Sequence, residues 1–378
     1  MHFVFMHPTG NGYHPGSPLT KPLGGTESAV VYLSTALVRA GAKVTLLNNP
    51  KDEAVIDGVH LLPSDKVPPG LINQCDVLVV ITTAVGSRIR ASFNHEVPMV
   101  LWCHLDVDLP FIAGLRQPDE REAWNGYVMV SQWQAQRFIS HFGLDAARTH
   151  VIGNAVSPAF LDQPASPAWF ETGASPTLFY SSTPFRGLDV LLQCFPSIRA
   201  RVPDVRLKIH SSMGIYGLGQ ERDGYRYLYE LARNLPGVDY IGPVSQPDLA
   251  VSLQSAAALA YPATFDETSC IAVMEALASG ADVLTTDRGA LPETLHGFGC
   301  MLKSDALKSP YAINNLMANA FIDMVVHTLE DARQNPAAAA AKRKARMAFV
   351  RENYTWDVRA QQWLALGQQL ARRKPTPR

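Results

Sequence analysis

The stretch ALAYPATFDETSCIAVMEALASGADVLTTDRGALPET, from Ala258 to Thr294, carries two glutamates eight positions apart, Glu267 and Glu275. Residues in a helix rise by about 1.5 Å each, so acids at this spacing touch an elongated ligand at two separate places. The spacing therefore predicts a site in which one carboxylate holds the near end of the ligand and the other reaches farther along it.

The run that follows Glu267 is apolar around nearly its whole circumference, which is typical of a helix that is buried on all sides. We expect this helix over Ser269 to Ala278, with Thr268 or Ser269 as its N-cap and Gly280 as its end. The amide groups of the first turn lie at the positive end of the helix dipole, so they are suited to face a phosphate.

Glu275 lies in the middle of this helix, where an ionised carboxylate without partners is costly. The vicinal hydroxyls of a ribose would supply two hydrogen-bond donors to it. The alternative is that Glu275 pairs with an internal arginine and that Glu267 only complements the helix dipole, which is worth roughly 0.3 to 1 kcal/mol.

The whole pattern resembles the donor-binding signature of the retaining GT-B glycosyltransferases, family 4 in particular: a strand ending in Tyr-Pro, two glutamates separated by seven residues, an Ala-x-Ala-x-Gly turn and a Pro-Glu. The resemblance extends along nearly the whole chain. It implies that Glu267 contacts hydroxyls of the transferred sugar and that Glu275 holds the nucleotide ribose. It also implies that the backbone amides at Thr268, Ser269 and Cys270 approach the sugar and the diphosphate.

Length and composition agree with a globular protein of two domains, since the chain has 378 residues, of which 47% are hydrophobic and 18% are charged. The formal net charge of -1 argues against a dedicated nucleic-acid binder. The cysteines show neither a CxxC pair nor zinc spacing, and we expect them to be reduced core residues of a cytoplasmic protein. They are Cys75, Cys103, Cys194, Cys270 and Cys300. With no signal-peptide pattern and no apolar run long enough to span a bilayer, we expect any membrane contact to be peripheral.

Short β-like runs alternate with helical patterns, which predicts parallel sheets covered by helices. The fold class we expect is α/β, in the form of two Rossmann-like, doubly wound domains of the GT-B type that face each other across a cleft. The predicted strands are His2–His7, Lys43–Leu47, Val77–Thr82, Met99–Cys103, Gly126–Val130, His150–Ile152, Thr177–Ser181, Arg206–His210, Val238–Ile241, Ala257–Tyr261 and Ala281–Thr285, with helices at Glu27–Ala40 and Trp133–Phe142 among them.

The domain boundary is expected near residue 160, because the segment Pro158 to Pro176 is rich in Pro, Ala and Ser and is typical of an interdomain connection. Residues 1–160 would form the acceptor-side domain and residues 161–354 the donor domain. The tail at 355–373 has apolar residues at helical spacing, and the resemblance implies that it crosses back and packs on the first domain.

In the first half, Gly24 and Gly25 permit close backbone approach just before a helix whose N-terminus can face an anion. The alternative is a tight turn that merely admits the helix. The resemblance implies that this loop lies against the donor phosphates and the acceptor. The long segment Pro8 to Leu23 is expected to help shape the acceptor pocket. His104 follows a strand, and the resemblance implies that it hydrogen-bonds the reacting sugar and is not a nucleophile; a lone histidine is otherwise usually structural.

Asp106 and Asp108 form a D-x-D pattern, which binds a divalent metal in GT-A glycosyltransferases. The two alternating halves and the donor signature in the second half do not fit that fold. We therefore interpret both aspartates as loop acids, and we expect no metal and no cofactor besides the nucleotide-sugar substrate.

Without a metal, fixed cations and amides must offset the charge that builds on the departing diphosphate. Arg186 is the leading candidate, because the resembled family often has Lys-Gly where Arg186-Gly187 stands here. The family commonly carries a second basic residue where Ser181 and Ser182 stand, and this departure leaves open whether Arg288 substitutes or whether the hydroxyls and helix amides suffice.

Four further features follow from position in the chain. The resemblance places the nucleotide base near Val244, Ser245 and Gln246, and Ser131 is expected to cap the helix at Trp133. Asn154 resembles the family's hinge motif, whose motion would close the cleft over the donor. A basic cluster on an alanine-rich helix is expected to be a solvated face, or a headgroup contact if the acceptor is lipid-linked. Its members are Lys342, Arg343, Lys344 and Arg346.

The sequence thus predicts a retaining glycosyltransferase that moves a hexose-type sugar from a nucleoside diphosphate donor to a hydroxyl of a glycan, a lipid-linked saccharide or a small acceptor. The favoured donor is a UDP-sugar, and GDP-mannose is the next candidate. The expected route is front-side displacement in which the donor phosphate takes the acceptor proton. Glu267, His104 and Arg186 are the predicted catalytic residues. The predicted donor-binding residues are Gly24, Gly25, Ser182, Arg186, Ser245, Thr268, Ser269, Cys270 and Glu275. The alternatives are a nucleotide-sugar epimerase or hydrolase of the same architecture, and a non-catalytic nucleotide-sugar-binding protein.

Overall fold

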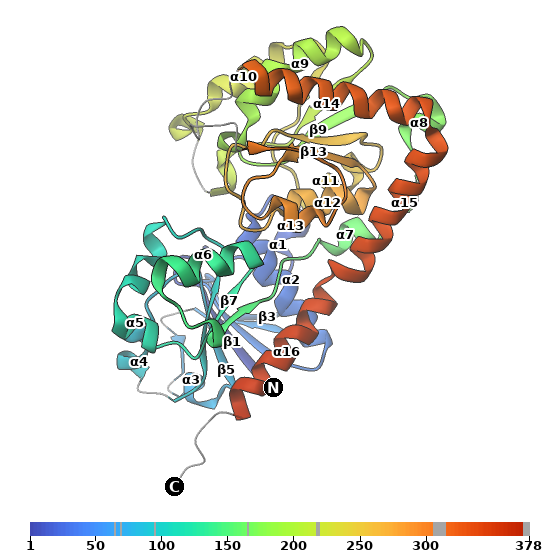
Figure 1. Cartoon of the computed structure of the whole chain (residues 1–378). Helices are drawn as coiled ribbons and strands as arrows, with labels where there is room; N and C mark the ends of the chain where they lie inside the picture. The colour runs from blue at the N-terminus through green and yellow to red at the C-terminus, as the bar shows by residue number, and fades with distance from the viewer. Residues whose placement is uncertain are drawn as a thin grey trace. The chain divides into compact units, whose positions relative to one another are not determined.

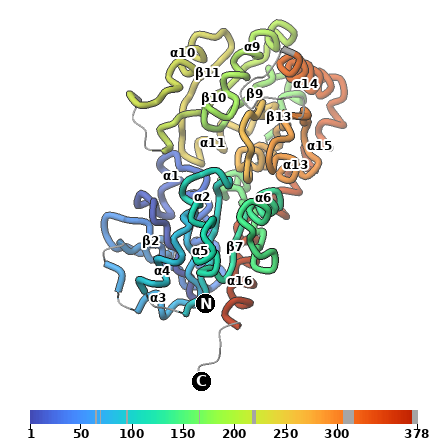
Figure 2. The backbone as a smooth tube through the Cα atoms, turned by 60° about the vertical axis from the view of Figure 1, so that its left-hand side comes forward, coloured from blue at the N-terminus to red at the C-terminus, as the bar shows by residue number. Residues whose placement is uncertain are grey.

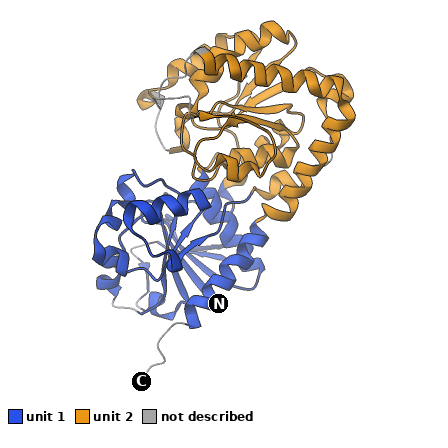
Figure 3. Ribbon diagram, viewed as in Figure 1, with its two compact units in different colours: residues 1–17, 25–155, 356–378 blue, residues 18–24, 156–355 orange. Residues whose placement is uncertain are grey.

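The computed structural model describes residues 1–63, 66–68, 70–93, 96–164, 166–216, 220–304 and 315–372. The chain forms two compact units, which Figure 3 shows in different colours. Unit 1 consists of residues 1–17, 25–155 and 356–378, and unit 2 consists of residues 18–24 and 156–355. The predicted α/β architecture with two sheets is confirmed.

Unit 1 is built on a sheet in the order β3-β4-β2-β1-β5-β6-β7-β8, in which every pair is parallel except β3 with β4. Its central strands are runs such as Val-Leu-Val-Val-Ile that are buried on both faces, as strands inside a parallel sheet are. The bounds are β1 (His2–Met6), β2 (Lys43–Leu47), β3 (Ala54–Ile56), β4 (Val59–Leu61), β5 (Val77–Ile81), β6 (Met99–Cys103), β7 (Gly126–Met129) and β8 (Thr149–Val151).

Helices cover both faces of this sheet, with α2 and α16 on one face and α4 and α5 on the other (Figure 1). Their bounds are α2 (Gly25–Arg39), α3 (Leu71–Gln74), α4 (Gly86–Phe93), α5 (Pro118–Glu122), α6 (Gln132–Phe142) and α16 (Trp356–Arg372), with 3-10 turns η2 (Pro110–Arg116) and η3 (Ala146–Arg148). The short helix α1 (Ser17–Thr20) begins in unit 1 and ends in unit 2.

Unit 2 contains a sheet of parallel strands in the order β11-β10-β9-β12-β13-β14. The bounds are β9 (Thr177–Tyr180), β10 (Arg206–Ile209), β11 (Val238–Tyr240), β12 (Ala258–Tyr261), β13 (Asp282–Thr286) and β14 (Cys300–Leu302). Because β12 lies in the interior of this sheet, the residues that follow Tyr261 leave the middle of its carboxyl edge, where open parallel sheets bind ligands.

In unit 2, α9, α10 and α14 cover one face of the sheet, and α11, α12 and α13 cover the other (Figures 1 and 2). The bounds are α7 (Pro158–Leu161), α8 (Trp169–Thr172), α9 (Leu188–Arg201), α10 (Arg226–Asn234), α11 (Gln246–Leu253), α12 (Ile271–Ser279), α13 (Leu291–Leu295), α14 (Asn315–Gln334) and α15 (Pro336–Asn353), with 3-10 turns η4 (Pro184–Arg186), η5 (Met213–Tyr216) and η6 (Gln220–Arg222).

The predicted strands are all present, with ends that differ by at most one residue. Ser131 caps α6 as predicted, since its hydroxyl accepts from the backbone N–H of Gln134 at 3.0 Å. Gly280 ends α12 as predicted, with φ of 79° in the left-handed region. The predicted strands did not include the antiparallel β3–β4 pair or β14.

The units change between residues 155 and 156, close to the expected boundary near residue 160, and Phe160 of α7 and Trp169 of α8 are buried in the core of unit 2. Two predictions about single residues are wrong. The N-cap of α12 is Cys270 and neither Thr268 nor Ser269. Arg346 does not lie on a solvated face, because it is buried and pairs with Asp282.

The C-terminal helix α16 belongs to unit 1, where it packs against α2. The indole of Trp363 meets Trp102 of β6 at 5.2 Å between ring centroids and Phe5 of β1 at 6.1 Å. The tail was predicted to reach Arg373, which lies outside the described residues. Within those residues, no helix is long and apolar enough to cross a membrane.

We expect Trp363→Ala to destabilise unit 1 by about 3 to 5 kcal/mol, because it removes a fully buried indole and leaves a cavity against the sheet. Urea unfolding followed by circular dichroism measures the loss. The exposed Gln361 on the same helix gives a control, Gln361→Ala, that is expected to unfold like the wild type. A loss below about 1 kcal/mol for Trp363→Ala would contradict the prediction.

Candidate functional site

The carboxylate of Glu267 lies in the loop between β12 and α12, and only 2% of the residue is exposed. Both of its oxygens accept hydrogen bonds from Nη1 of Arg186, each at 2.8 Å. The hydroxyl of Tyr261, the last residue of β12, donates to Oε1 of the same carboxylate. The buried charge of Glu267 is therefore neutralised by one cation and held by one hydroxyl.

Arg186 ends the 3-10 turn η4, and its side chain is 24% exposed. Burial works against the charge of its guanidinium, but the Glu267 carboxylate outweighs that effect and holds the pKa of Arg186 above its ordinary value. The guanidinium also lies over the rings of Phe265 and Phe185, at 4.7 and 5.5 Å from their centroids. Its contacts with Glu267 use Nη1, and its Nε has no hydrogen-bond partner among the described residues. Arg186 thus keeps donor capacity for a second anion.

Two glycines make this arrangement possible. Gly187 has φ of 117°, and a Cβ there would collide with the carbonyl oxygen of Pro262. Gly289 has φ of 61°, and a Cβ there would collide with the backbone of Glu267, which the neighbouring Ala290 holds by an N–H bond of 2.7 Å. Only glycine fits either position without strain, so the backbone on both sides of the Arg186–Glu267 pair is fixed by close approach.

The start of α12 follows directly on Glu267. Its N-cap, Cys270, is buried and makes no side-chain cap. The hydroxyl oxygen of Ser269 is buried and has no hydrogen-bond partner among the described residues, whereas Thr268 does have an interaction. The predicted amide donors therefore lie beside the acid–arginine pair at a helix end that no side-chain cap occupies.

Glu275 lies one turn from the end of α12 and is 4% exposed. Burial raises the pKa of Glu275 to about 8, and a hydrogen bond with the Gln246 side chain opposes that rise. The Oε1 atom of Gln246 is itself buried without a partner among the described residues. No arginine pairs with Glu275 in the described part of the chain, so the alternative of an internal arginine partner is not what the structure shows.

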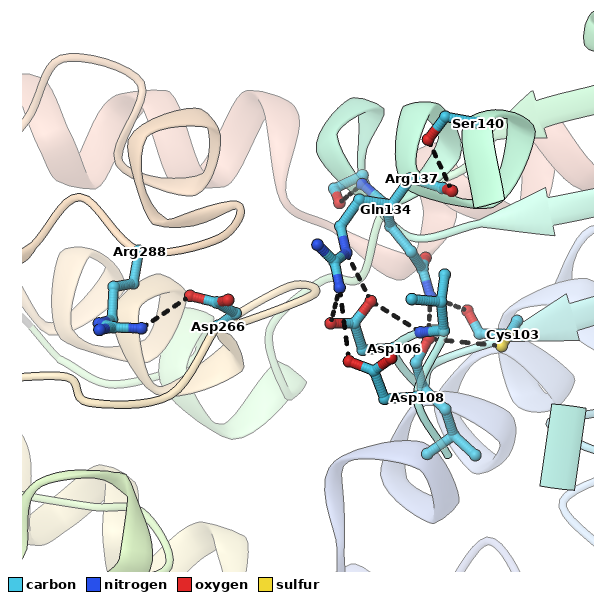
Figure 4. A network of polar contacts seen from close by, with 11 residues as sticks. Cys103, Asp106, Asp108, Gln134, Arg137, Ser140, Asp266 and Arg288 are labelled. Atoms are coloured by element: carbon cyan, nitrogen blue, oxygen red, sulfur yellow. Dashed lines mark hydrogen bonds and ion pairs between the residues drawn. The ribbon is translucent and has the colours of Figure 1, made fainter. Parts of the chain in front are cut away.

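The other donor-binding residues predicted in unit 2 lie on the ends of neighbouring elements. Ser182 follows β9, and its hydroxyl is 3.5 Å from that of Tyr261. Ser245 caps α11, and its hydroxyl donates to Asp248 at 2.6 Å. Arg288, the candidate for the second cation, pairs with Asp266 at 3.2 Å (Figure 4). The structure thus brings Arg186, Glu267 and Ser182 around Tyr261, while Ser245 is held in a separate cap.

Unit 1 holds His104, which follows β6 and packs against the tilted ring of Trp102 at 4.6 Å between ring centroids. Burial lowers the pKa of His104 to about 3; the nearby His7 lowers it further, and a hydrogen bond with the Asn154 side chain opposes the shift. Burial likewise lowers the pKa of His7 to about 4, and its Nδ1 lies 2.7 Å from the hydroxyl of Tyr13. Both imidazoles are therefore neutral near pH 7.

The two glycines predicted at the first helix fall on either side of the division between units. Gly25 is the first residue of α2 and is exposed, whereas Gly24 is buried and belongs to unit 2. Neither has a φ in the left-handed region. They mark the start of α2 without demanding a backbone that only glycine adopts.

The D-x-D aspartates are engaged by an arginine of α6 (Figure 4). Arg137 donates from Nε and Nη2 to the two oxygens of Asp106, at 2.8 and 2.9 Å, and its Nη2 lies 3.7 Å from Asp108. In this fork-to-carboxylate geometry, the guanidinium of Arg137 supplies hydrogen bonds to both oxygens of Asp106. The described residues contain no group of three or more His, Cys, Asp or Glu side chains placed to hold a metal ion.

The sequence did not point to Tyr261 or Gln246 as partners of the two glutamates. In the sequence pattern, Tyr261 is part of the Tyr-Pro that ends the strand, and Gln246 stands next to Ser245, where the resemblance places the nucleotide base. The signal that identifies both is a buried carboxylate, which requires a hydrogen-bond donor from a neighbouring strand end or helix start.

Residues 176–331, which contain Arg186, Glu267 and Glu275, match the family model described as glycosyl transferases group 1. A D-inositol 3-phosphate glycosyltransferase of Corynebacterium aurimucosum is 33% identical over 112 residues, which are 29% of this chain and 25% of that protein. The match thus spans about a quarter of that relative's length.

Solved structures are similar over nearly the whole chain. The glycosyltransferase from Rickettsia africae has a TM-score of 0.72 at 13% identity, with 99% of each chain covered. HepE from Anabaena, solved with UDP, has a TM-score of 0.66 at 17% identity, with 98% of this chain and 100% of that chain covered; it has also been solved with UDP-glucose. The chain therefore has the two-domain GT-B fold, and its residues 176–331 match the model of the group 1 glycosyltransferases.

Proposed function

We propose that this protein is a retaining, metal-independent glycosyltransferase that moves a hexose-type sugar from a nucleoside diphosphate sugar to a hydroxyl group. The observation that carries the proposal is the cluster of Arg186, Tyr261 and Glu267 just before the start of α12, with Glu275 buried on the same helix. A buried acid, a cation with donors to spare and a helix N-terminus are what a sugar diphosphate requires.

UDP-sugar is the donor that we favour, with GDP-mannose next. The support is that HepE, which shares the fold, was solved with UDP and with UDP-glucose. Glu275 and Gln246 are our candidates for the ribose, because a buried carboxyl without an ion-pair partner and an unpartnered amide oxygen both accept hydrogen bonds from vicinal hydroxyls.

Each residue then has a distinct part in the reaction. Arg186 and the first amides of α12 offset the charge that develops on the departing diphosphate. Glu267 accepts hydrogen bonds from sugar hydroxyls, and we assign the acceptor proton to the donor phosphate in a front-side displacement. Because burial lowers its pKa to about 3, His104 is neutral near pH 7 and is suited to hydrogen-bond a hydroxyl, not to act as a general acid.

The acceptor is a glycan, a lipid-linked saccharide or a small molecule, and a cytoplasmic protein with peripheral membrane contact would suit the second of these. Lys342 and Lys344 of α15 are exposed and would be the headgroup contacts in that case. Arg346 is excluded from that role by its burial.

A non-catalytic nucleotide-sugar-binding protein is the second candidate, because serines stand at 181 and 182 where the resembled family has a second cation. A hydrolase or epimerase of this architecture is distinguished by product analysis. We expect wild-type protein with UDP-glucose to release UDP faster when acceptor sugars are added; binding of UDP without any turnover of UDP- and GDP-sugars would establish the non-catalytic alternative.

We expect the two glutamates to separate binding from turnover. Glu275→Gln should weaken UDP binding at least about tenfold in calorimetry, because the amide keeps only one acceptor oxygen for the two ribose hydroxyls. Glu267→Gln should lower kcat about 10²- to 10³-fold with nearly unchanged UDP affinity, because it acts on the sugar. The exposed Glu330 on α14 supplies the control Glu330→Gln. Equal and negligible effects of the first two changes would count against the proposal.

The stability of the protein should depend on the ionisation of Glu275. Since its folded pKa of about 8 lies above the ordinary value, the folded state binds the proton more tightly, and stability is lost as the pH rises from about 4.5 to 8. Glu275→Gln removes this loss, so its thermal midpoint at pH 8.5 should exceed that of the wild type by roughly 5 °C or more. At pH 4 to 5 the two proteins should be close. A variant that is less stable than the wild type at pH 8.5 would show that Glu275 is satisfied as a carboxylate.

A further inference from the structure

We propose that Tyr261 is the positioning residue of Glu267: its hydroxyl holds one carboxylate oxygen so that the other faces the sugar of the donor. This inference rests on the proposed function and adds a residue to it. Tyr261 ends β12 and is fully buried, so its ring cannot turn toward solvent and its hydroxyl has a fixed direction.

The two oxygens of Glu267 are not equivalent. Oε1 accepts from both the Tyr261 hydroxyl and Nη1 of Arg186, whereas the hydrogen bond to Oε2 comes from Nη1 of Arg186. A carboxylate oxygen has two lone-pair directions. Both lone-pair directions of Oε1 are therefore used, whereas Oε2 can accept one more hydrogen bond, from a sugar hydroxyl.

The need for a tyrosine follows from what a donor does to Arg186. A diphosphate attracts the guanidinium as Glu267 does. When the guanidinium lies between the two anions, its hydrogen bonds to the carboxylate are weaker. The Tyr261 hydroxyl carries no charge and is not drawn to the phosphates. It therefore holds the orientation of the Glu267 carboxylate when Arg186 also binds the diphosphate.

The proton of this hydroxyl stays on Tyr261 throughout. Burial raises the pKa of Tyr261 well above its ordinary value, and the charge of Glu267 raises it further. Tyr261 is thus a permanent donor and takes no part as an acid or base. Its effect on catalysis is geometric, through Glu267.

A neighbouring tyrosine shows that this direction is specific. Tyr180 ends β9, and its ring lies 5.6 Å from that of Tyr261 between centroids. Its hydroxyl donates to the backbone carbonyl of Thr183 at 2.7 Å, not to an acid. Of these two buried, neighbouring tyrosines, Tyr261 alone donates to Glu267.

The test is Tyr261→Phe, which keeps the ring and removes the hydroxyl. With UDP-glucose as the probe, kcat should fall about 10- to 100-fold, while the calorimetric Kd for UDP should change less than about twofold, since Tyr261 is not assigned a nucleotide contact. The matched control is Tyr240→Phe, which removes a tyrosine hydroxyl bonded to the Ser211 carbonyl at 2.8 Å in the same unit and should leave kcat unchanged.

A double-mutant cycle shows whether Tyr261 acts through Glu267. If it does, Tyr261→Phe lowers kcat no further in a Glu267→Gln background, whereas a purely structural role gives additive losses with a lowered thermal midpoint. Additive losses, an unchanged kcat or a parallel loss of UDP affinity overturns the inference. Wild-type protein that turns over none of the UDP- and GDP-sugars overturns the proposed function, and the inference falls with it; normal wild-type turnover with an unaffected Tyr261→Phe overturns the inference alone.

Discussion

The neutralisation of one buried charge governs the arrangement of unit 2. A carboxylate that is 2% exposed cannot stay ionised without a partner. Glu267 is paired with the guanidinium of Arg186 and accepts a hydrogen bond from the hydroxyl of Tyr261. The partners come from the ends of η4 and β12, which the sheet order brings together because β9 and β12 are neighbours. Gly187 and Gly289 then follow as the residues whose lack of a Cβ lets the backbones close around the pair. The burial of one acid thus accounts for the backbone conformation of two loops.

The two glutamates of the signature have opposite electrostatic situations, although they stand eight residues apart on one segment. Glu267 is paired, and the charge on both partners is stabilised. Glu275 has only an amide against it, and burial raises its pKa to about 8. An isolated folded protein gains nothing from leaving a carboxyl in that state. A buried carboxyl with so few partners is expected where a ligand supplies the missing hydrogen-bond donors, because functional sites keep arrangements that stability alone does not favour.

The sequence predicts well whatever depends on repeating patterns. The strands were placed within one residue because buried parallel strands are continuous apolar runs. It fails where the outcome depends on contacts between distant segments. Nothing local shows that Trp169 fills the core of unit 2, that Arg346 is drawn inward by Asp282, or that the hydroxyl of Tyr261 is directed at Glu267. Nor does the local sequence show that the N-cap position of α12 falls on Cys270 and not on the serine before it.

The missing second cation illustrates how charge is distributed when a residue type is absent. The hydroxyl of Ser181 is buried without a partner among the described residues, so it offers a hydrogen bond but no charge. Arg288 does carry charge, yet it is paired with Asp266, whose side chain is 43% exposed. Water screens a half-exposed acid more than it screens a buried arginine, so Asp266 cancels only part of the field of Arg288. The positive potential near Glu267 therefore comes chiefly from Arg186 and the helix amides, with a partial contribution from Arg288. A diphosphate bound there would depend more on Arg186 than it would in a site with two unpaired basic residues.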